Sequence, residues 1–98
     1  MSLRYSQQAL RDLREIRDFY RSESSRAAGR VSREILRALE LIHRRPAIGI
    51  RSAPDKRIRS KLLVRYPYRI YYRLMAGGVI ILHIRHTARR PWPGEDQP

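Results

Sequence analysis

The chain has 98 residues, enough for one compact domain with one core and too few for a large buried catalytic cleft. Its 22 basic and nine acidic residues give a formal charge of +13, which favours a negatively charged partner, either nucleic acid or an acidic protein segment. The absence of cysteine excludes disulfides and thiolate metal sites.

The sequence contains no segment with the length and hydropathy of a membrane span. Residues 1–9 also lack the hydrophobic stretch of a secretion signal, because Arg4, Gln7 and Gln8 interrupt it. We therefore expect a cytoplasmic protein that makes no membrane contact.

The N-terminal half predicts a short extended segment, Leu3 to Tyr5, followed by two helices. Ser6 can cap the first helix, whose apolar residues recur at helical spacing: Ala9, Leu10, Leu13, Ile16 and Tyr20. The cluster Ser22 to Ser25 can cap the second helix, which Pro46 ends. The apolar side of the second helix carries Ala28, Val31, Ile35, Ala38, Leu39 and Ile42. A hairpin of two helices buries too little to be stable alone, so it must pack on another layer.

The C-terminal half predicts a sheet. Pro46 to Asp55 reads as an irregular connection, after which β-branched and aromatic residues dominate. Strands are expected at Ile58 to Val64, Tyr68 to Met75 and Val79 to His86, with a tight hairpin turn at 76–78.

Alternation along these strands assigns their side chains to two faces. In the second strand one face carries Tyr68, Ile70, Tyr72 and Leu74. In the third strand Ile80, Leu82 and Ile84 alternate with Val79, Ile81 and His83. We expect the helices to cover one of the two faces.

These elements predict an α+β fold, in which a short N-terminal strand and a two-helix hairpin pack on a small, mostly antiparallel β-sheet. Residues 1–90 are expected to form the single domain. Residues 91–98 hold three prolines and a glycine, which predicts a flexible tail.

The sequence offers few groups for catalysis or metal binding. From Leu41 to Gly94 the only carboxylate is Asp55, which argues against a mechanism with paired acids. His43 closes the second helix, where a cation interacts favourably with the helix dipole. His83 and His86 are three residues apart on a strand, so they point to opposite faces and do not converge on a metal ion. We predict neither a cofactor nor a metal site.

Arginines dominate the predicted sheet: Arg57, Arg59, Arg65, Arg69, Arg73, Arg85, Arg89 and Arg90. On paired strands they can form one basic face, interleaved with Tyr66, Tyr71 and Trp92 for stacking, which predicts a docking surface for phosphate or carboxylate. The alternative is a solvated sheet face without a partner. So many arginines with so few acids favour the docking surface.

Several of these features together resemble the RelE/ParE superfamily of toxins, which belong to type II toxin-antitoxin systems and are also known as plasmid stabilisation proteins. The features are the order of the elements, Pro46 and Gly49 after the second helix, the run Tyr68 to Arg73, and the run Ile81 to Arg89. The resemblance covers nearly the whole chain. Arg69 and the His86 to Arg89 segment are the matching positions.

Within that superfamily the sequence resembles the ParE-like branch more than the RelE-like one. RelE-like ribosome-dependent messenger-RNA endoribonucleases place lysines, or a glutamate with a histidine, around the arginine, and this sequence has no glutamate facing Arg69. Its ending, His86 to Arg89 followed by Arg90, Pro91 and Trp92, resembles ParE-like members. The resemblance implies a toxin that is not an enzyme, inhibits DNA gyrase by protein contact, and is neutralised by a cognate ParD-like antitoxin in a hetero-oligomer.

The residues expected to bind the target are Arg65, Arg69, Arg73, His86, Arg89, Arg90 and Trp92. Trp92 has two interpretations, an aromatic anchor for the target or an indole packed over the sheet edge. In the ribonuclease alternative, which would contact the ribosome or RNA, Arg69, His86 and Arg89 carry the catalysis, with His86 as acid or base. A third alternative is a basic domain that binds nucleic acid nonspecifically, with a strong salt dependence.

Overall fold

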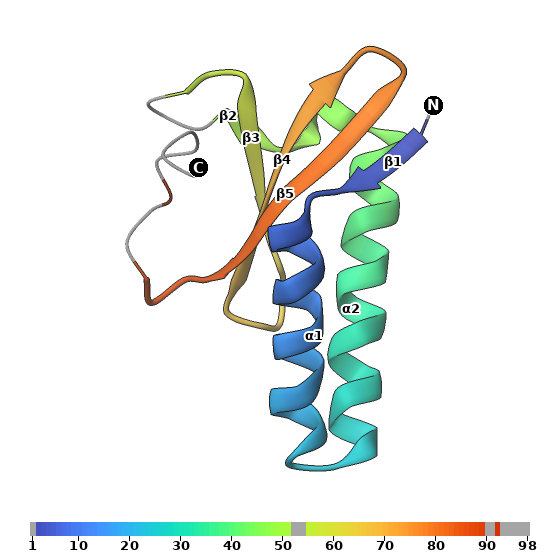
Figure 1. Ribbon diagram of the computed structural model, residues 1–98, viewed down its shortest axis with the longest axis vertical. Coiled ribbons are helices and arrows are strands. Elements are labelled where there is room, and N and C mark those ends of the chain that lie inside the picture. Colours follow the sequence, from blue (N-terminus) through green and yellow to red (C-terminus); the bar gives the residue numbers. More distant parts are fainter. Residues whose placement is uncertain (1, 52–54, 90–91, 93–98) are drawn as a thin grey trace.

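Two helices packed on a five-stranded sheet make up the described part of the chain (Figure 1). The computed structural model describes residues 2–51, 55–89 and 92. In chain order the elements are β1 (Ser2–Tyr5), α1 (Gln7–Arg21), α2 (Ser25–Arg44), the 3-10 turn η1 (Pro46–Ile48), β2 (Ile50–Arg51), β3 (Ile58–Leu62), β4 (Tyr68–Met75) and β5 (Gly78–His86).

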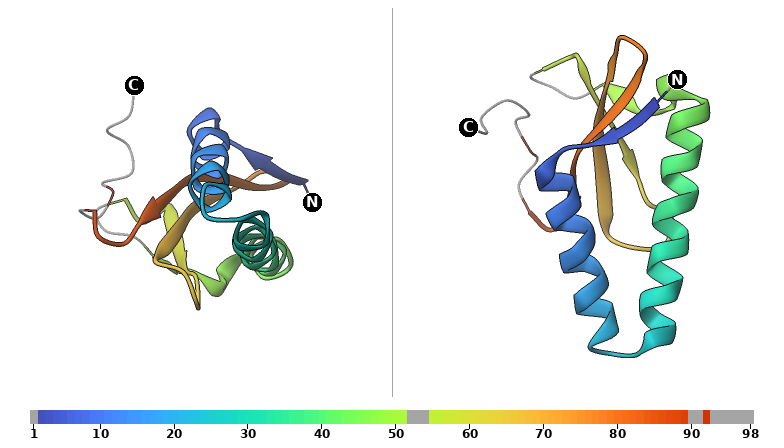
Figure 2. Two further views of the ribbon diagram at one scale, coloured as in Figure 1. Left: turned by 90° about the horizontal axis from the view of Figure 1, so that it is seen from below. Right: turned by 45° about the vertical axis from the view of Figure 1, so that its right-hand side comes forward.

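The strands lie in the order β1-β5-β4-β3-β2. β1 pairs with β5 in parallel, and the other three pairs are antiparallel. Both helices lie on the same side of the sheet (Figure 2). The predicted α+β class, with a short first strand and a helical hairpin on a mostly antiparallel sheet, is therefore confirmed.

Both helices begin where serine side chains cap them. The Ala9 amide donates to Ser6 Oγ at 2.9 Å, and the Ala27 amide donates to Ser24 Oγ at 2.9 Å. All six residues predicted for the apolar side of α2 are buried, and α2 ends at Arg44 before Pro46, with His43 in its last turn. In α1, Leu10 is 43% exposed and is not part of the buried core.

The main core lies between the helices and one sheet face. From the sheet it contains Tyr68, Ile70, Tyr72, Val79, Ile81 and Ile84. Leu74 lies on this face as predicted, opposite Val79, but near the end of β4, where it is 44% exposed. The opposite face, called the outer face below, has a smaller cluster of Ile58, Tyr71 and Trp92.

A bulge in β5 overturns the predicted alternation of that strand. Tyr71 pairs with His83 and Tyr72 pairs with Ile81, so Leu82 has no partner on β4. An extra residue of this kind reverses the faces that follow it. As a result Ile84 joins Val79 and Ile81 in the core, although the pattern had placed it with Ile80 and Leu82.

The connection predicted to be irregular contains regular structure at residues 46–51. It contains η1 and β2, whose Ile50 and Arg51 pair with Ser60 and Arg59 of β3. β3 ends at Leu62, two residues before the predicted end at Val64. Neither helix in the described ranges has the length and hydropathy to cross a membrane. The predicted tail, 91–98, lies outside the described residues except for Trp92.

Candidate functional site

The outer face of the sheet carries several of the arginines predicted to bind a target. Arg69 lies opposite Leu62 on β3 and Arg85 on β5, and Arg73 lies opposite Ile58 and Ile80. Directly opposed residues point to the same face, and Tyr68 and Ile70 of β4 point into the core. Arg69, Arg73 and Arg85 therefore share the outer face.

Arg69 is anchored within this face. Its Nη1 donates to Ser60 Oγ at 2.9 Å, and Ser60 is 4% exposed. The hydrogen bond restricts the guanidinium to one region of the sheet, so it is partly preorganised for an anion such as carboxylate or phosphate.

Trp92 lies on the same face but is not exposed. It is 4% exposed, and its ring meets Tyr71 at 5.2 Å and His83 at 5.2 Å between centroids, both edge to face. This is the packed arrangement, the second of the two interpretations given above, because a buried indole offers little surface to a partner.

The remaining arginines do not extend the basic face as predicted. Arg59 lies opposite Tyr72 on the helix side, where its Nη1 donates to the Gly49 carbonyl at 2.9 Å, so the prediction of one common face was wrong for it. Arg57 precedes β3 and binds Asp55. Arg65 is exposed in the turn between β3 and β4, and Arg90 lies outside the described residues.

His86 and Arg89 lie on the helix side instead. His86 is opposite Tyr68, with 5.4 Å between ring centroids, and both residues open with Arg89 onto a surface hollow of about 420 Å³. The rest of the lining is Ile84 of β5 and five residues of α1: Asp12, Glu15, Ile16, Phe19 and Tyr20. Burial, together with a hydrogen bond to Tyr20, raises the pKa of Tyr68 to about 12.

The turn after β5 is held by backbone hydrogen bonds, one to the turn before β4 and one within itself. The Thr87 amide donates to the Pro67 carbonyl at 2.8 Å, and the Arg89 amide donates to the His86 carbonyl at 3.1 Å. The predicted target-binding residues thus form two groups, Arg69 with Arg73 on the outer face and His86 with Arg89 beside α1. The three residues of the ribonuclease alternative, Arg69, His86 and Arg89, are divided between the two sides.

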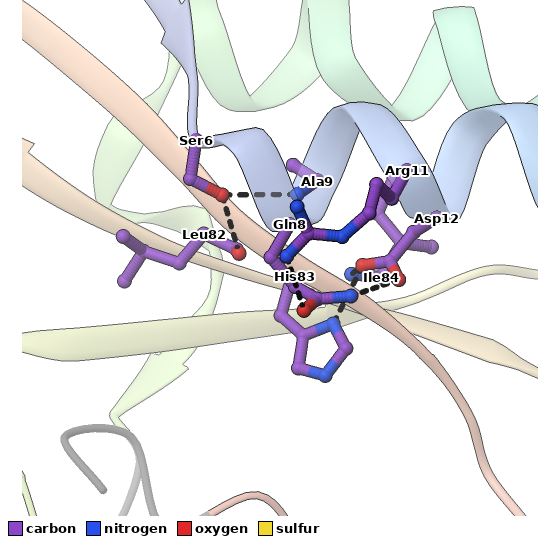
Figure 3. A network of polar contacts seen from close by, with 8 residues as sticks. All are labelled: Ser6, Gln8, Ala9, Arg11, Asp12, Leu82, His83 and Ile84. Atoms are coloured by element: carbon purple, nitrogen blue, oxygen red, sulfur yellow. Dashed lines mark hydrogen bonds and ion pairs between the residues drawn. The ribbon is translucent and has the colours of Figure 1, made fainter. Parts of the chain in front are cut away.

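Sequence reasoning missed Asp12, which connects α1 to β5 (Figure 3). His83 Nδ1 donates to Asp12 Oδ2 at 2.6 Å, and the Ile84 amide donates to the same oxygen at 2.8 Å. Gln8 Nε2 donates to Asp12 Oδ1 at 2.9 Å. A signal existed in the sequence, because position 12 is three residues after Ala9 and four before Ile16, on the apolar side of the helix.

The buried Asp12 accepts a hydrogen bond from a backbone amide at the edge of β5. β1 pairs with β5 only from Gly78 to Ile81. Beyond that point α1 takes the place of a neighbouring strand: Ser6 Oγ donates to the Leu82 carbonyl at 2.7 Å, and Asp12 accepts from Ile84. Among the described residues, no three histidine, aspartate or glutamate side chains are arranged to hold a metal ion.

Comparisons with known proteins place this arrangement in context. A family model described as the ParE toxin of the type II toxin-antitoxin system parDE matches residues 3–91. A solved structure described as the chromosomal ParDE TA system from P. aeruginosa is similar, with a TM-score of 0.75 and 24% identity over 88% of this chain and 95% of that chain. Among curated proteins no match is found.

Proposed function

The chain belongs to the ParE toxin family of type II toxin-antitoxin systems, and on that premise we propose that it inhibits DNA gyrase by protein contact, without a chemical reaction of its own. It is the toxin of its system. The match over residues 3–91 is the observation that carries the proposal, since it runs from β1 to beyond Arg89.

The placement of the arginines and histidines supports a toxin that is not an enzyme. Cleavage of RNA needs a general base and a cation within reach of one phosphate. Arg69 and His86 point to opposite faces of the sheet, and Arg69 is bonded to Ser60. Asp12 and Glu15 of α1 line the hollow with His86 and Arg89, but Asp12 is already engaged by His83 and by the Ile84 amide.

We place the target contact around the end of β5. Arg89 and His86 line the hollow beside α1, and Arg69 and Arg73 extend the surface onto the outer face. Arg65, which is exposed in the turn before β4, is a further candidate, and Arg90 stays a prediction from the sequence. Arginine is enriched among the residues that dominate binding energy at interfaces, which suits a contact with acidic groups of a protein target.

A ParD-like antitoxin is the partner we propose for the free toxin. The solved structure from P. aeruginosa is described as a ParDE system. In this chain a groove of about 290 Å³ between α1 and α2 is flanked by the exposed Leu10 and Leu36 and by Arg14 and Arg17. An amphipathic segment with apolar and acidic residues fits such a groove. Because gyrase acts on the chromosome, the compartment we propose is the cytoplasm.

Two assays on the purified toxin, freed of its antitoxin, test the target. One measures supercoiling of plasmid DNA by purified bacterial gyrase, and the other measures messenger-RNA cleavage in a translating extract. We expect loss of supercoiling with intact messenger RNA. Arg89→Ala should lower the inhibitory potency about tenfold, as loss of one important interface residue does.

Arg30→Ala is the matched control, since it removes the same charge from an exposed position on α2. It should leave the potency unchanged. Ribosome-dependent cleavage that disappears in Arg69→Ala would contradict the proposal and establish the ribonuclease alternative.

A further inference from the structure

Three buried residues, one from α1 and two from the C-terminal part of the chain, form a continuous set of contacts. Asp12 of α1 and His83 of β5 are each 6% exposed, and Trp92 is 4% exposed. Asp12 Oδ2 accepts from His83 Nδ1 at 2.6 Å, and the His83 ring meets the Trp92 indole at 5.2 Å with an interplanar angle of 87°. The fold therefore connects α1 to Trp92 through one imidazole.

The bulge at Leu82 is what gives His83 two neighbours. Because of the bulge, His83 lies opposite Tyr71 and faces the outer cluster, where Trp92 packs on both rings. The edge of β5 is open at this point because β1 has ended, so the Nδ1 atom can still reach Asp12 on α1 (Figure 3). The carboxylate fixes the orientation of the ring that Trp92 packs against.

We propose that His83, oriented by Asp12, is a positioning residue for target binding: it holds Trp92 on the outer face and thereby fixes the C-terminal segment, Ile84–Arg89 with Trp92. The inference rests on the proposed function, because that segment carries His86 and Arg89. It assigns to a buried histidine control over the exposed residues His86 and Arg89, which we place at the target contact.

The physical reason is preorganisation. Up to Arg89 the segment is held by β5 and by the turn bonds to Pro67 and His86. Trp92 is the next described residue after Arg89, and its packing on His83 and Tyr71 holds the far end. If that end were released, ordering Arg89 would reduce the free energy gained when the target binds.

The variant His83→Asn should remove the contact that positions Trp92 while leaving the protein folded. The asparagine Nδ2 occupies nearly the place of the imidazole Nδ1, so Asp12 keeps a donor and α1 keeps its connection to β5. The aromatic edge that meets Trp92 is removed. We expect circular dichroism and the urea midpoint to stay near those of the wild type, while the potency against gyrase falls about tenfold.

Fluorescence provides a direct reading, since Trp92 is the single tryptophan of the chain. In His83→Asn the emission of the isolated toxin should move to longer wavelength as the indole enters water. Tyr72→Phe is the matched control: it removes hydrogen bonds from the Gly49 amide at 2.8 Å and to the Pro46 carbonyl at 2.7 Å, and Tyr72 lies in the helix-side core, on the face opposite to Tyr71 and Trp92. It should change neither the emission nor the potency of the folded protein.

A double-mutant cycle with Trp92→Ala decides whether His83 acts through Trp92. If it does, His83→Asn should cause no further loss of potency in the Trp92→Ala background. Trp92→Phe, which keeps an aromatic ring, should restore most of the potency. The inference would be overturned if the losses of potency in His83→Asn and Trp92→Ala were additive. It would also be overturned if His83→Asn left the Trp92 emission unchanged, or shifted the emission but kept full potency.

Failure of the gyrase proposal is distinguishable from failure of this one. If the wild-type toxin does not inhibit gyrase, the proposed target is wrong, whereas the emission of Trp92 still reports on His83. The cycle is then measured by growth arrest on induced expression without antitoxin, which does not depend on the identity of the target. Equal arrest by His83→Asn and wild type would then reject the positioning role.

Discussion

At the scale of single residues, hydrogen bonds from Arg57 determine the charge state of Asp55. Asp55 Oδ1 accepts from the Arg57 amide at 2.9 Å and from its Nε at 3.1 Å, and Oδ2 accepts from Nη2 at 2.8 Å. These bonds favour the ionised carboxylate and lower the pKa of Asp55 to about 2. The pair holds the loop that leads into β3.

This pair predicts a loss of stability in acid. The folded-state pKa of about 2 lies below the ordinary value of 3.8, so the contribution is present above about pH 4 and is lost as the pH falls toward 2. In Asp55→Asn the free energy of unfolding should vary less with pH in this window. Urea unfolding at several pH values in the window measures the difference from wild type.

Asp18→Asn serves as the control for that titration. Asp18 is an exposed carboxylate of α1 whose distance to Arg17 is 3.7 Å, too long for a strong pair. Its acid profile should match that of the wild type. A profile of Asp55→Asn that runs parallel to the wild type would show that the pair does not contribute.

At the scale of elements, the attachment of β1 depends on a close backbone approach. Ser2 lies opposite Gly78, and the Ser2 amide donates to the Gly77 carbonyl at 2.8 Å. A Cβ on residue 78 would stand 2.0 Å from the Ser2 carbonyl oxygen. Only glycine leaves room for the parallel pairing of the first and last strands.

Gly78→Ala should therefore detach β1 from β5. We expect faster hydrogen exchange at the β1 amides Leu3 to Tyr5, and a loss of about 1–3 kcal/mol in unfolding free energy from the steric clash. Gly29→Ala is the control, because a Cβ there meets only Arg33 Nη1, at 3.4 Å, on a helix that alanine favours. Unchanged protection of β1 in Gly78→Ala would refute this explanation.

At the scale of the whole molecule, the charge of +13 opposes the compact state of the free toxin. Salt shortens the range of that repulsion, from about 10 Å at 0.1 M to about 3 Å at 1 M. An acidic partner would relieve the same repulsion, which is a physical reason for the toxin to be more stable in its complex.

The free toxin should accordingly unfold at a higher temperature as sodium chloride is raised from about 0.1 M to about 1 M. Thermal unfolding followed by circular dichroism measures the midpoint. Sodium chloride is preferable to sulfate, because sulfate strengthens apolar burial in any protein. A midpoint that stays constant or falls would show that the repulsion is already neutralised within the chain.

The elements with a local pattern were predictable from the sequence. Ser6 and Ser24 cap their helices, the apolar side of α2 forms its part of the core, and β4 runs from Tyr68 to Met75 as expected. Helical spacing, alternation and serine caps act between residues a few positions apart. β2 escaped prediction because two residues make no pattern.

The sequence by itself determined the fold class, the family resemblance and the charge, but only the tertiary structure decided how the site is arranged. The bulge at Leu82 results from the pairing of Tyr71 with His83 and of Tyr72 with Ile81. The hydrogen bond between Asp12 and His83 joins residues 71 positions apart in the chain. The same bulge places Arg69 and His86 on opposite faces of the sheet, and Trp92 is buried where it packs on Tyr71 and His83. Contacts of this kind depend on the register and packing of elements far apart in the chain, which periodicity does not encode.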